Sequence, residues 1–137
     1  MKVKELFSED YRVVAVMDGD SCPAEDFMRE GEESTRAARD GLLQVLMFVA
    51  ANGLQKCPSG WYHEVNKKEG IYEFIKHPLR LFFFKGEGKD IAVCTTGIRK
   101  KGQKVDKSSV IRAANWRKSY FESINSATLE VIENEDQ

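Results

Sequence analysis

The alternation of apolar and polar positions predicts a strand and then a helix in the first third of the chain. Residues 11–17 (YRVVAVM) are rich in β-branched side chains and stop at the turn signal DGD, as a strand does. Pro23 suits the first turn of a helix, which we expect to be short and to end near Gly31.

A second helix is predicted from about Ser34 to Asn52. Its apolar residues recur at the i, i+3, i+4, i+7 spacing that places them on one face of a helix. These residues are Leu42, Val45, Leu46 and Val49. The two helices are joined by a short polar segment, so we expect an αα-hairpin.

After residue 60 the pattern changes to the short apolar runs that are typical of strands. We expect three strands, at residues 71–76 (IYEFIK), 80–85 (RLFFFK) and 91–98 (IAVCTTGI). The sequence Gly-Glu-Gly at residues 86–88 is a hairpin signal, and it joins the second of these strands to the third.

A last helix is predicted from its cap, Ser108 or Ser109, through an amphipathic run to Ile124. The order of elements is therefore β-α-α-β-β-β-α, which predicts an α+β fold in which a small antiparallel sheet is packed by helices. We expect one domain over residues 1–124, followed by an acidic C-terminal tail over residues 125–137.

The composition is that of an ordinary soluble protein, with 42% hydrophobic and 31% charged residues. The first ten residues lack the apolar core of a secretory signal, and no apolar run is long enough to cross a membrane. The three cysteines, Cys22, Cys57 and Cys94, are odd in number and form no CxxC pair. Free thiols are typical of a reducing compartment, so we expect a cytoplasmic protein.

Charge is distributed unevenly along the chain, although the formal net charge is only −1. Residues 1–56 hold 7 Lys and Arg against 11 Asp and Glu, and residues 122–137 hold none against 5. The middle segment, residues 57–121, holds 14 against 6, a net charge of +8. Such a local excess can attract phosphate, because charges are screened only beyond a Debye length of roughly 8 Å. The middle segment is therefore a candidate nucleic-acid interface.

Arg80 begins the second of the three predicted strands. It shares a face with Phe82 and Phe84, because alternate side chains of a strand point the same way. One interpretation is an arginine that stacks on an aromatic ring and keeps its head in water. The other is a guanidinium that binds phosphate, a planar fork of fixed charge on a rigid element.

A basic run, RKKGQK at residues 99–104, follows the third predicted strand. On its own, such a run is typical of a solvated loop. At the end of the hairpin, however, part of the run could converge with Arg80 and Lys76 on one patch, while strand alternation would turn the rest away.

The two histidines, His63 and His77, have no metal-ligand spacing to each other or to the cysteines, so we expect no bound metal. His77 precedes Pro78 and lies in the turn between two predicted strands. It is either an exposed turn residue or a proton-transfer group, since imidazole changes its charge near neutral pH.

Residues 71–121 resemble the HigB-like, phage-derived branch of the RelE/ParE toxin superfamily. The shared features are an R-x-x-x-F strand, present here as RLFFF, and a strand ending in K-K-x-Q-K, present here as KKGQK. A helix with an early alanine, VIRAANWRKSYF, follows in the same order. The preceding helices fit by pattern only, and the resemblance ends at the acidic tail.

This resemblance implies a RelE-like domain that is the toxin of a type II toxin–antitoxin system. Such toxins are ribosome-dependent, metal-free mRNA endoribonucleases that inhibit translation, need no cofactor and are blocked by a cognate helix-turn-helix antitoxin. The implied partners are this antitoxin, the ribosome and mRNA, with no membrane. The implied catalytic residues are Arg80, His77 and Lys100, and the implied RNA-binding residues are Lys76, Arg99, Lys101 and Lys104.

The acid–base residue and the target both have alternatives. Several toxins of the superfamily carry a histidine or tyrosine near the C-terminus, and the late candidate here is Tyr120. Glu73 or a lysine is therefore an alternative to His77 for proton transfer. A related branch acts on DNA gyrase, so the alternative function is a non-catalytic inhibitor or binding protein on the same scaffold, either a gyrase-type toxin or a degenerate phage protein.

Overall fold

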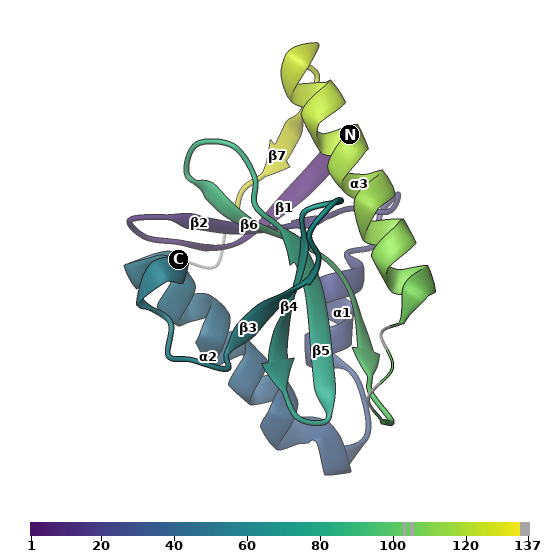
Figure 1. The fold of residues 1–137 in the computed structure, drawn as a ribbon. Coiled ribbons are helices and arrows are strands. Elements are labelled where there is room, and N and C mark those ends of the chain that lie inside the picture. The colour runs from purple at the N-terminus through teal and green to yellow at the C-terminus, as the bar shows by residue number, and fades with distance from the viewer. Residues whose placement is uncertain (103, 105, 135–137) are drawn as a thin grey trace.

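One mixed sheet of seven strands, with three α-helices on its two faces, forms the part of the chain that this computed structural model describes, residues 1–102, 104 and 106–134 (Figure 1). The strands lie side by side in the order β3-β4-β5-β6-β2-β1-β7. Their bounds are β1 Lys2–Ser8, β2 Arg12–Val16, β3 Tyr62–Asn66, β4 Ile71–Lys76, β5 Leu79–Phe84, β6 Asp90–Arg99 and β7 Glu130–Ile132. The helices are α1 Pro23–Arg29, α2 Arg36–Asn52 and α3 Lys107–Asn125, with short 3-10 turns at Glu33–Thr35 and Leu54–Lys56.

The predicted fold class is wrong, because the sheet is larger than expected and is not antiparallel throughout. β2 pairs in parallel with β6, and β7 in parallel with β1, whereas the other neighbours are antiparallel. β1, β3 and β7 are additions to the predicted order β-α-α-β-β-β-α. The added strands have no clean apolar period: β3, for example, reads YHEVN and lies at an edge of the sheet, where neither face needs to be apolar throughout.

The three strands expected after residue 70 are present as β4, β5 and β6, and they pair antiparallel as predicted. The last helix begins two or three residues before its predicted cap, since its N-cap is Asp106. The hydroxyls of Ser108 and Ser109 donate to the Asp106 carboxylate at 2.9 and 3.0 Å. These hydrogen bonds, first that of Ser108, lower the pKa of Asp106.

The central strands are buried on both faces, which explains the continuous apolar sequence of β5. Leu81 and Phe83 pack in the layer between the sheet and helices α1 and α2, whereas Phe82 and Phe84 pack on the opposite face with α3. The predicted stripe on α2 is buried in the first of these layers; it consists of Leu42, Val45, Leu46 and Val49. A strand enclosed in this way holds the residue at its solvent end rigidly.

A buried polar network joins the parallel strand pair to α3. Arg12 of β2 and Asp90 of β6 are register partners, and the Arg12 guanidinium donates to Asp90 Oδ1. The Tyr120 hydroxyl donates to Asp90 Oδ2 at 3.0 Å and accepts from the backbone N–H of Glu87 at 3.1 Å. Burial raises the pKa of Tyr120 to about 12. The hydrogen bond to Asp90 raises the pKa of Arg12.

β7 lies within the segment expected to form an acidic tail. Its three residues pair in parallel with residues 2–4 of β1, and the side-chain amide of Asn134 donates to the carbonyl of Leu6 at 3.0 Å. The end of that segment, residues 135–137, lies outside the described residues.

Candidate functional site

Three ionisable side chains from neighbouring strands meet on the α3 face of the sheet. His63 of β3 is the register partner of Glu73 of β4. On β5, the register partner of Glu73 is Phe82. Arg80 lies two residues from Phe82 on the same strand and therefore points to the same face. Arg80 Nε and His63 Nε2 each lie 3.3 Å from Glu73 Oε1. We call these three residues the His63–Glu73–Arg80 cluster.

Among the described residues, α3 is the helix that packs on the face of the sheet where the cluster lies. In Figure 1, the turn between β4 and β5 joins the lower ends of these strands, and α3 lies above and to one side of them. The exposed fraction of the side chain rises from 3% for Glu73 to 15% for Arg80 and 53% for His63. The carboxylate is therefore enclosed, while the imidazole reaches solvent.

The hydrogen-bonding capacity of the cluster is only partly used. Arg80 Nη1 donates to the carbonyl of Leu79 at 3.1 Å. The 3.3 Å approach of Arg80 Nε to Glu73 Oε1 lacks hydrogen-bond geometry. Neither of these buried atoms has a hydrogen-bond partner within the described residues. Buried polar groups are normally hydrogen-bonded. Arg80 Nε, a donor, and Glu73 Oε1, an acceptor, therefore face each other as an ion pair without a formed hydrogen bond.

The contacts of Arg80 bear on one of the two interpretations of its sequence, that of an arginine stacked on an aromatic ring. Its register partners are Ile75 of β4 and Ile98 of β6, which flank it on the same face. Within the described residues, cation–aromatic contacts are made by Lys85 over Tyr72 and by Arg117 over Phe121, and not by Arg80. Arg80 is thus an ion-paired residue at a sheet surface rather than an arginine stacked on its neighbouring phenylalanines.

Two of the predicted RNA-binding residues lie on the other face of the sheet. Lys76 is the register partner of Leu79, and its aliphatic chain lies against Gly41 of α2. Arg99 also pairs with Leu79, and its guanidinium donates to Glu32 at 3.2 Å. Strand alternation therefore separates both cations from Arg80.

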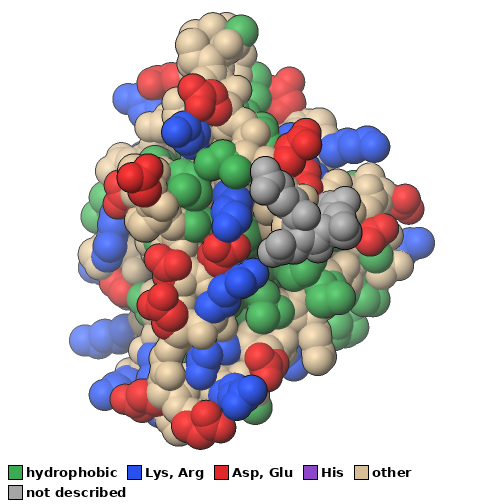
Figure 2. Space-filling model, turned by 180° about the vertical axis from the view of Figure 1, so that it is seen from behind, with side chains coloured by type: hydrophobic (Ala, Val, Ile, Leu, Met, Phe, Trp, Pro, Cys, Tyr) green, Lys and Arg blue, Asp and Glu red, His purple; other side chains and the backbone are tan. Residues whose placement is uncertain are grey.

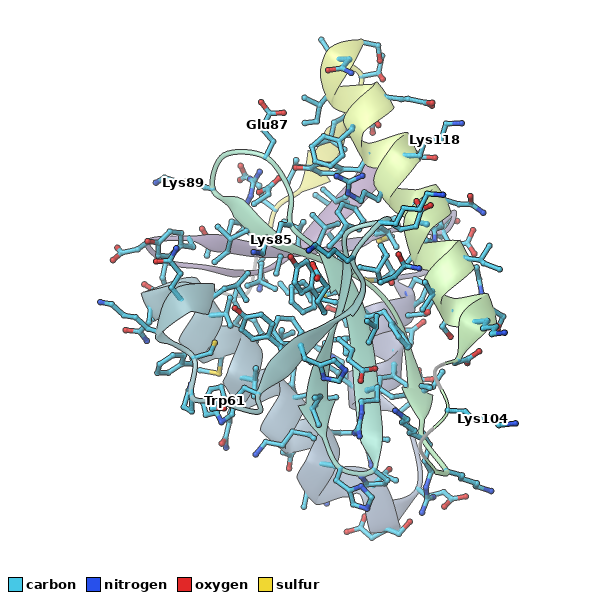
Figure 3. The ribbon with its side chains drawn as sticks, viewed as in Figure 1. Trp61, Lys85, Glu87, Lys89, Lys104 and Lys118 are labelled. Atoms are coloured by element: carbon cyan, nitrogen blue, oxygen red, sulfur yellow. The ribbon has the colours of Figure 1, made fainter. Side chains whose placement is uncertain are left out.

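The remaining predicted residues lie in the turn between β4 and β5 and in the segment between β6 and α3. His77 is exposed in the turn between β4 and β5. Lys100 lies beside this turn, because its backbone N–H donates to the carbonyl of Pro78 at 2.7 Å. Lys101 and Lys104 are exposed in the loop before α3, and Lys104 points away from the sheet in Figure 3. Gln103 of the KKGQK motif lies outside the described residues.

The excess of positive charge in the middle segment is spread over several surfaces. Figure 2 shows the side of the molecule opposite to Figure 1, where basic and acidic side chains are intermixed. On the described surface, the ion pair of Arg99 with Glu32 at 3.2 Å neutralises part of this charge. Location on the sheet, rather than local net charge, therefore distinguishes Arg80 from the other cations.

Sequence reasoning did not predict the position of His63 beside Glu73. It considered this residue only as a metal ligand, and it predicted no strand at residues 62–66 that would place the imidazole beside Glu73. Tyr120, the late tyrosine considered from the sequence, belongs instead to the buried network with Asp90. The sequence of residues 62–66, YHEVN, has no apolar period that would have predicted this strand.

Other kinds of site find little support in the described part of the chain. Among the described residues, no group of three or more His, Cys, Asp or Glu side chains is placed to hold a metal ion. Cys22, Cys57 and Cys94 are free, and burial raises the pKa of each thiol. Within the same residues, no helix is long and apolar enough to cross a membrane.

Comparison with known proteins gives no further assignment. No protein-family model matches this chain, and no curated protein matches it in sequence. The interpretation of the site therefore rests on the chain's own residues and their geometry.

Proposed function

We propose that this chain is the toxin of a type II toxin–antitoxin pair, a ribosome-dependent, metal-free mRNA endoribonuclease with the His63–Glu73–Arg80 cluster at its active site. The observation that carries the proposal is the position of Arg80, on a rigid strand beside a buried carboxylate with unused hydrogen-bonding atoms. The resemblance of residues 71–121 to HigB-like toxins supplies the substrate class. The cluster supplies the chemistry.

Arg80 would bind the scissile phosphate. In this type of cleavage, the 2′-hydroxyl attacks the adjacent phosphorus, and the phosphorane that forms carries additional negative charge. A guanidinium can hydrogen-bond two phosphate oxygens at once. Within the described residues Arg80 Nη2 makes no hydrogen bond or ion pair, so it can meet a phosphate without losing a protein partner. Lys100, held beside the same end of β5, would add a second positive charge.

The proposed partners are the ribosome, mRNA and a cognate helix-turn-helix antitoxin, all in the cytoplasm. A cleavage site open to solvent must be blocked in the host cell until it is needed. The simplest blocker brings carboxylates to the cationic site, because electrostatic complementarity both speeds association and selects the partner.

Induced expression in a bacterial host, with mapping of mRNA 5′ ends, tests the proposal. We expect growth arrest and new 5′ ends within translated messages. Arg80→Lys should remove both effects, because lysine keeps the charge beside Glu73 but loses the bidentate fork. The matched control is Arg112→Lys on the exposed side of α3, which should behave as wild type. Intact messages in cells that make soluble wild-type protein would contradict an endoribonuclease.

A second candidate function is a non-catalytic binding protein, such as a gyrase-type inhibitor or a degenerate phage protein. One observation favours it: Arg80 is only 15% exposed and faces a buried carboxylate, as a structural arginine does. Growth arrest with intact messages and inhibited DNA supercoiling would support this alternative.

A further inference from the structure

We propose that His63 is the general base of the cleavage reaction, oriented by Glu73, and that His77 has no catalytic role. This inference rests on the proposed function, since it names the group that removes the 2′-hydroxyl proton. It follows from the placement of the three cluster residues on successive strands, where one carboxylate oxygen lies 3.3 Å from both the imidazole and the guanidinium.

His63 has a carboxylate beside one ring nitrogen and solvent beside much of the rest of the ring. Its Nε2 faces Glu73, which is 3% exposed, while the imidazole as a whole is 53% exposed. The 3.3 Å approach of Nε2 to Glu73 Oε1 lacks hydrogen-bond geometry, as that of Arg80 Nε does, but a carboxylate at this distance from one ring nitrogen favours one ring orientation and stabilises the imidazolium that forms when the other nitrogen takes a proton. Nδ1 makes no hydrogen bond within the described residues, so it is available to substrate.

The charged groups around His63 are few, because β3 is an edge strand whose one neighbour in the described sheet is β4. On the cluster face they are Glu73 of β4 and Arg80 of β5. At the far end of β3, Lys107 of α3 lines a groove with Val65 and Asn66. Glu73 is thus the one charged group within ion-pair distance of the imidazole among the described residues.

Glu73 has a separate effect on each neighbour. With Arg80 it forms a buried pair whose charges offset each other, so the guanidinium can remain in place before substrate arrives. With His63 it forms a carboxylate–imidazole pair of the kind that supports general-base catalysis. The phosphate held by Arg80 would then lie on the same face as the base, which is the geometry that attack by a neighbouring hydroxyl requires.

The reaction step can be written with every bond and proton placed. The 2′-hydroxyl oxygen forms a bond to phosphorus while its proton passes to Nδ1 of neutral His63. The bond between phosphorus and the 5′-oxygen breaks, and this oxygen takes a proton from water. The hydroxide left behind accepts the proton of the imidazolium, which restores neutral His63. The products are a 2′,3′-cyclic phosphate and a 5′-hydroxyl, with no oxidant, reductant or metal required.

His77 provides a matched comparison within the same protein. It lies in the exposed β4–β5 turn, and no hydrogen bond or ion pair joins it to another described residue. An imidazole without an orienting partner keeps its rotational freedom, so its proton-transfer geometry is not fixed. The two histidines therefore differ in the one feature that the proposal depends on.

The test compares His63→Gln and His77→Gln in cleavage of mRNA by purified protein on programmed ribosomes, at saturating protein and from pH 5.5 to 8.5. We expect His63→Gln to lower the single-turnover rate about 10²–10⁴-fold, the range typical of a lost general base. It should also abolish the fall in rate toward acid pH that protonation of the base produces. Ribosome binding should be unchanged, and His77→Gln should cleave within about twofold of wild type.

A further variant separates a catalytic role from a structural one. His63→Ala should regain part of its activity when free imidazole is added, whereas a variant that has lost a structural contact would not. A His63→Gln protein that cleaves within threefold of wild type, or with the wild-type pH profile, overturns the inference. If His63→Gln remains active while Arg80→Lys is inactive, the proposed function stands and the inference alone fails. If wild-type protein does not cleave, both fail.

Discussion

Removal of the Tyr120 hydroxyl should destabilise the fold, because this atom joins α3 to the buried network at Asp90. In Tyr120→Phe the ring keeps its contacts with Phe84 and Phe121, whose centroids lie 5.5 and 5.1 Å away. The lost contacts are the hydrogen bond to Asp90 Oδ2 and the one accepted from the N–H of Glu87. The change therefore tests the polar network with the apolar packing held constant.

The magnitude follows from the charge and burial of the partner. Asp90 is 3% exposed, and Arg12 still donates to its other oxygen, so the carboxylate does not become unpaired. A hydrogen bond to a charged group contributes about 1.5–3 kcal/mol. We expect the free energy of unfolding to fall by about 2 kcal/mol, and Tm by roughly 5–10 °C for a chain of this length.

Urea unfolding followed by circular dichroism measures this difference, and Tyr62→Phe is the matched control. The Tyr62 ring packs against Tyr72, Phe74 and Phe83, but its hydroxyl makes no hydrogen bond within the described residues. Its removal should change the free energy of unfolding by less than about 0.5 kcal/mol. Equal and small effects of the two substitutions would show that the Asp90 network contributes little to stability.

Two further predictions concern the same fold. Gly97→Ala should lower the free energy of unfolding by about 1–3 kcal/mol, because a Cβ there would overlap the Phe27 ring of α1. Gly41→Ala in α2 displaces only the flexible chain of Lys76 and should be neutral or stabilising. Equal thermal melts for the two variants would contradict the packing of α1 on β6. Burial raises the pKa of Tyr120 to about 12, above the value near 10 of an unfolded tyrosine. Between these two pH values the native state binds more protons than the unfolded state, so its stability falls as pH rises. Between about pH 10 and 12, wild type should lose roughly 2–3 kcal/mol more than Tyr120→Phe in urea titrations, and parallel losses would place Tyr120 in contact with solvent.

The sequence predicts the parts of the fold that have strong apolar periods. The stripe of Leu42 and Leu46 on α2 and the run of β5 are long or apolar enough to be recognised, and both are buried as expected. The edge strands are not recognisable in this way. β7 (EVI) is three residues long, and its pairing with β1 depends on a contact across almost the whole chain.

The candidate site, like the fold, could be predicted only in part from the sequence. Arg80 could be singled out because a charge in an apolar strand is unusual. Its pairing with Glu73, and that of Glu73 with His63, depends on the register of three strands, one of which was not predicted. The placement of Lys76 and Arg99 on the opposite face follows from strand alternation and from the register of β4, β5 and β6, in which both residues pair with Leu79.

The Glu73 contact also changes how Arg80 must be tested. From the sequence alone, an alanine at position 80 would be expected to affect stability only slightly. In the structure, this change leaves Glu73 buried with His63 as its sole ion-pair partner among the described residues. Removal of one member of a buried pair costs about 3–5 kcal/mol, so lost activity could follow from lost folding. Lysine keeps the charge and avoids this ambiguity.

The most direct test of the central claim is cleavage of a defined mRNA on programmed ribosomes by purified wild-type, Arg80→Lys and Arg112→Lys proteins, with 5′ ends mapped by primer extension. The account predicts new 5′ ends at the same positions with wild type and Arg112→Lys, and a rate at least about a hundredfold lower with Arg80→Lys, as expected for loss of a preorganised charge at the phosphorane. Cleavage by folded Arg80→Lys at the wild-type positions and rate would contradict it.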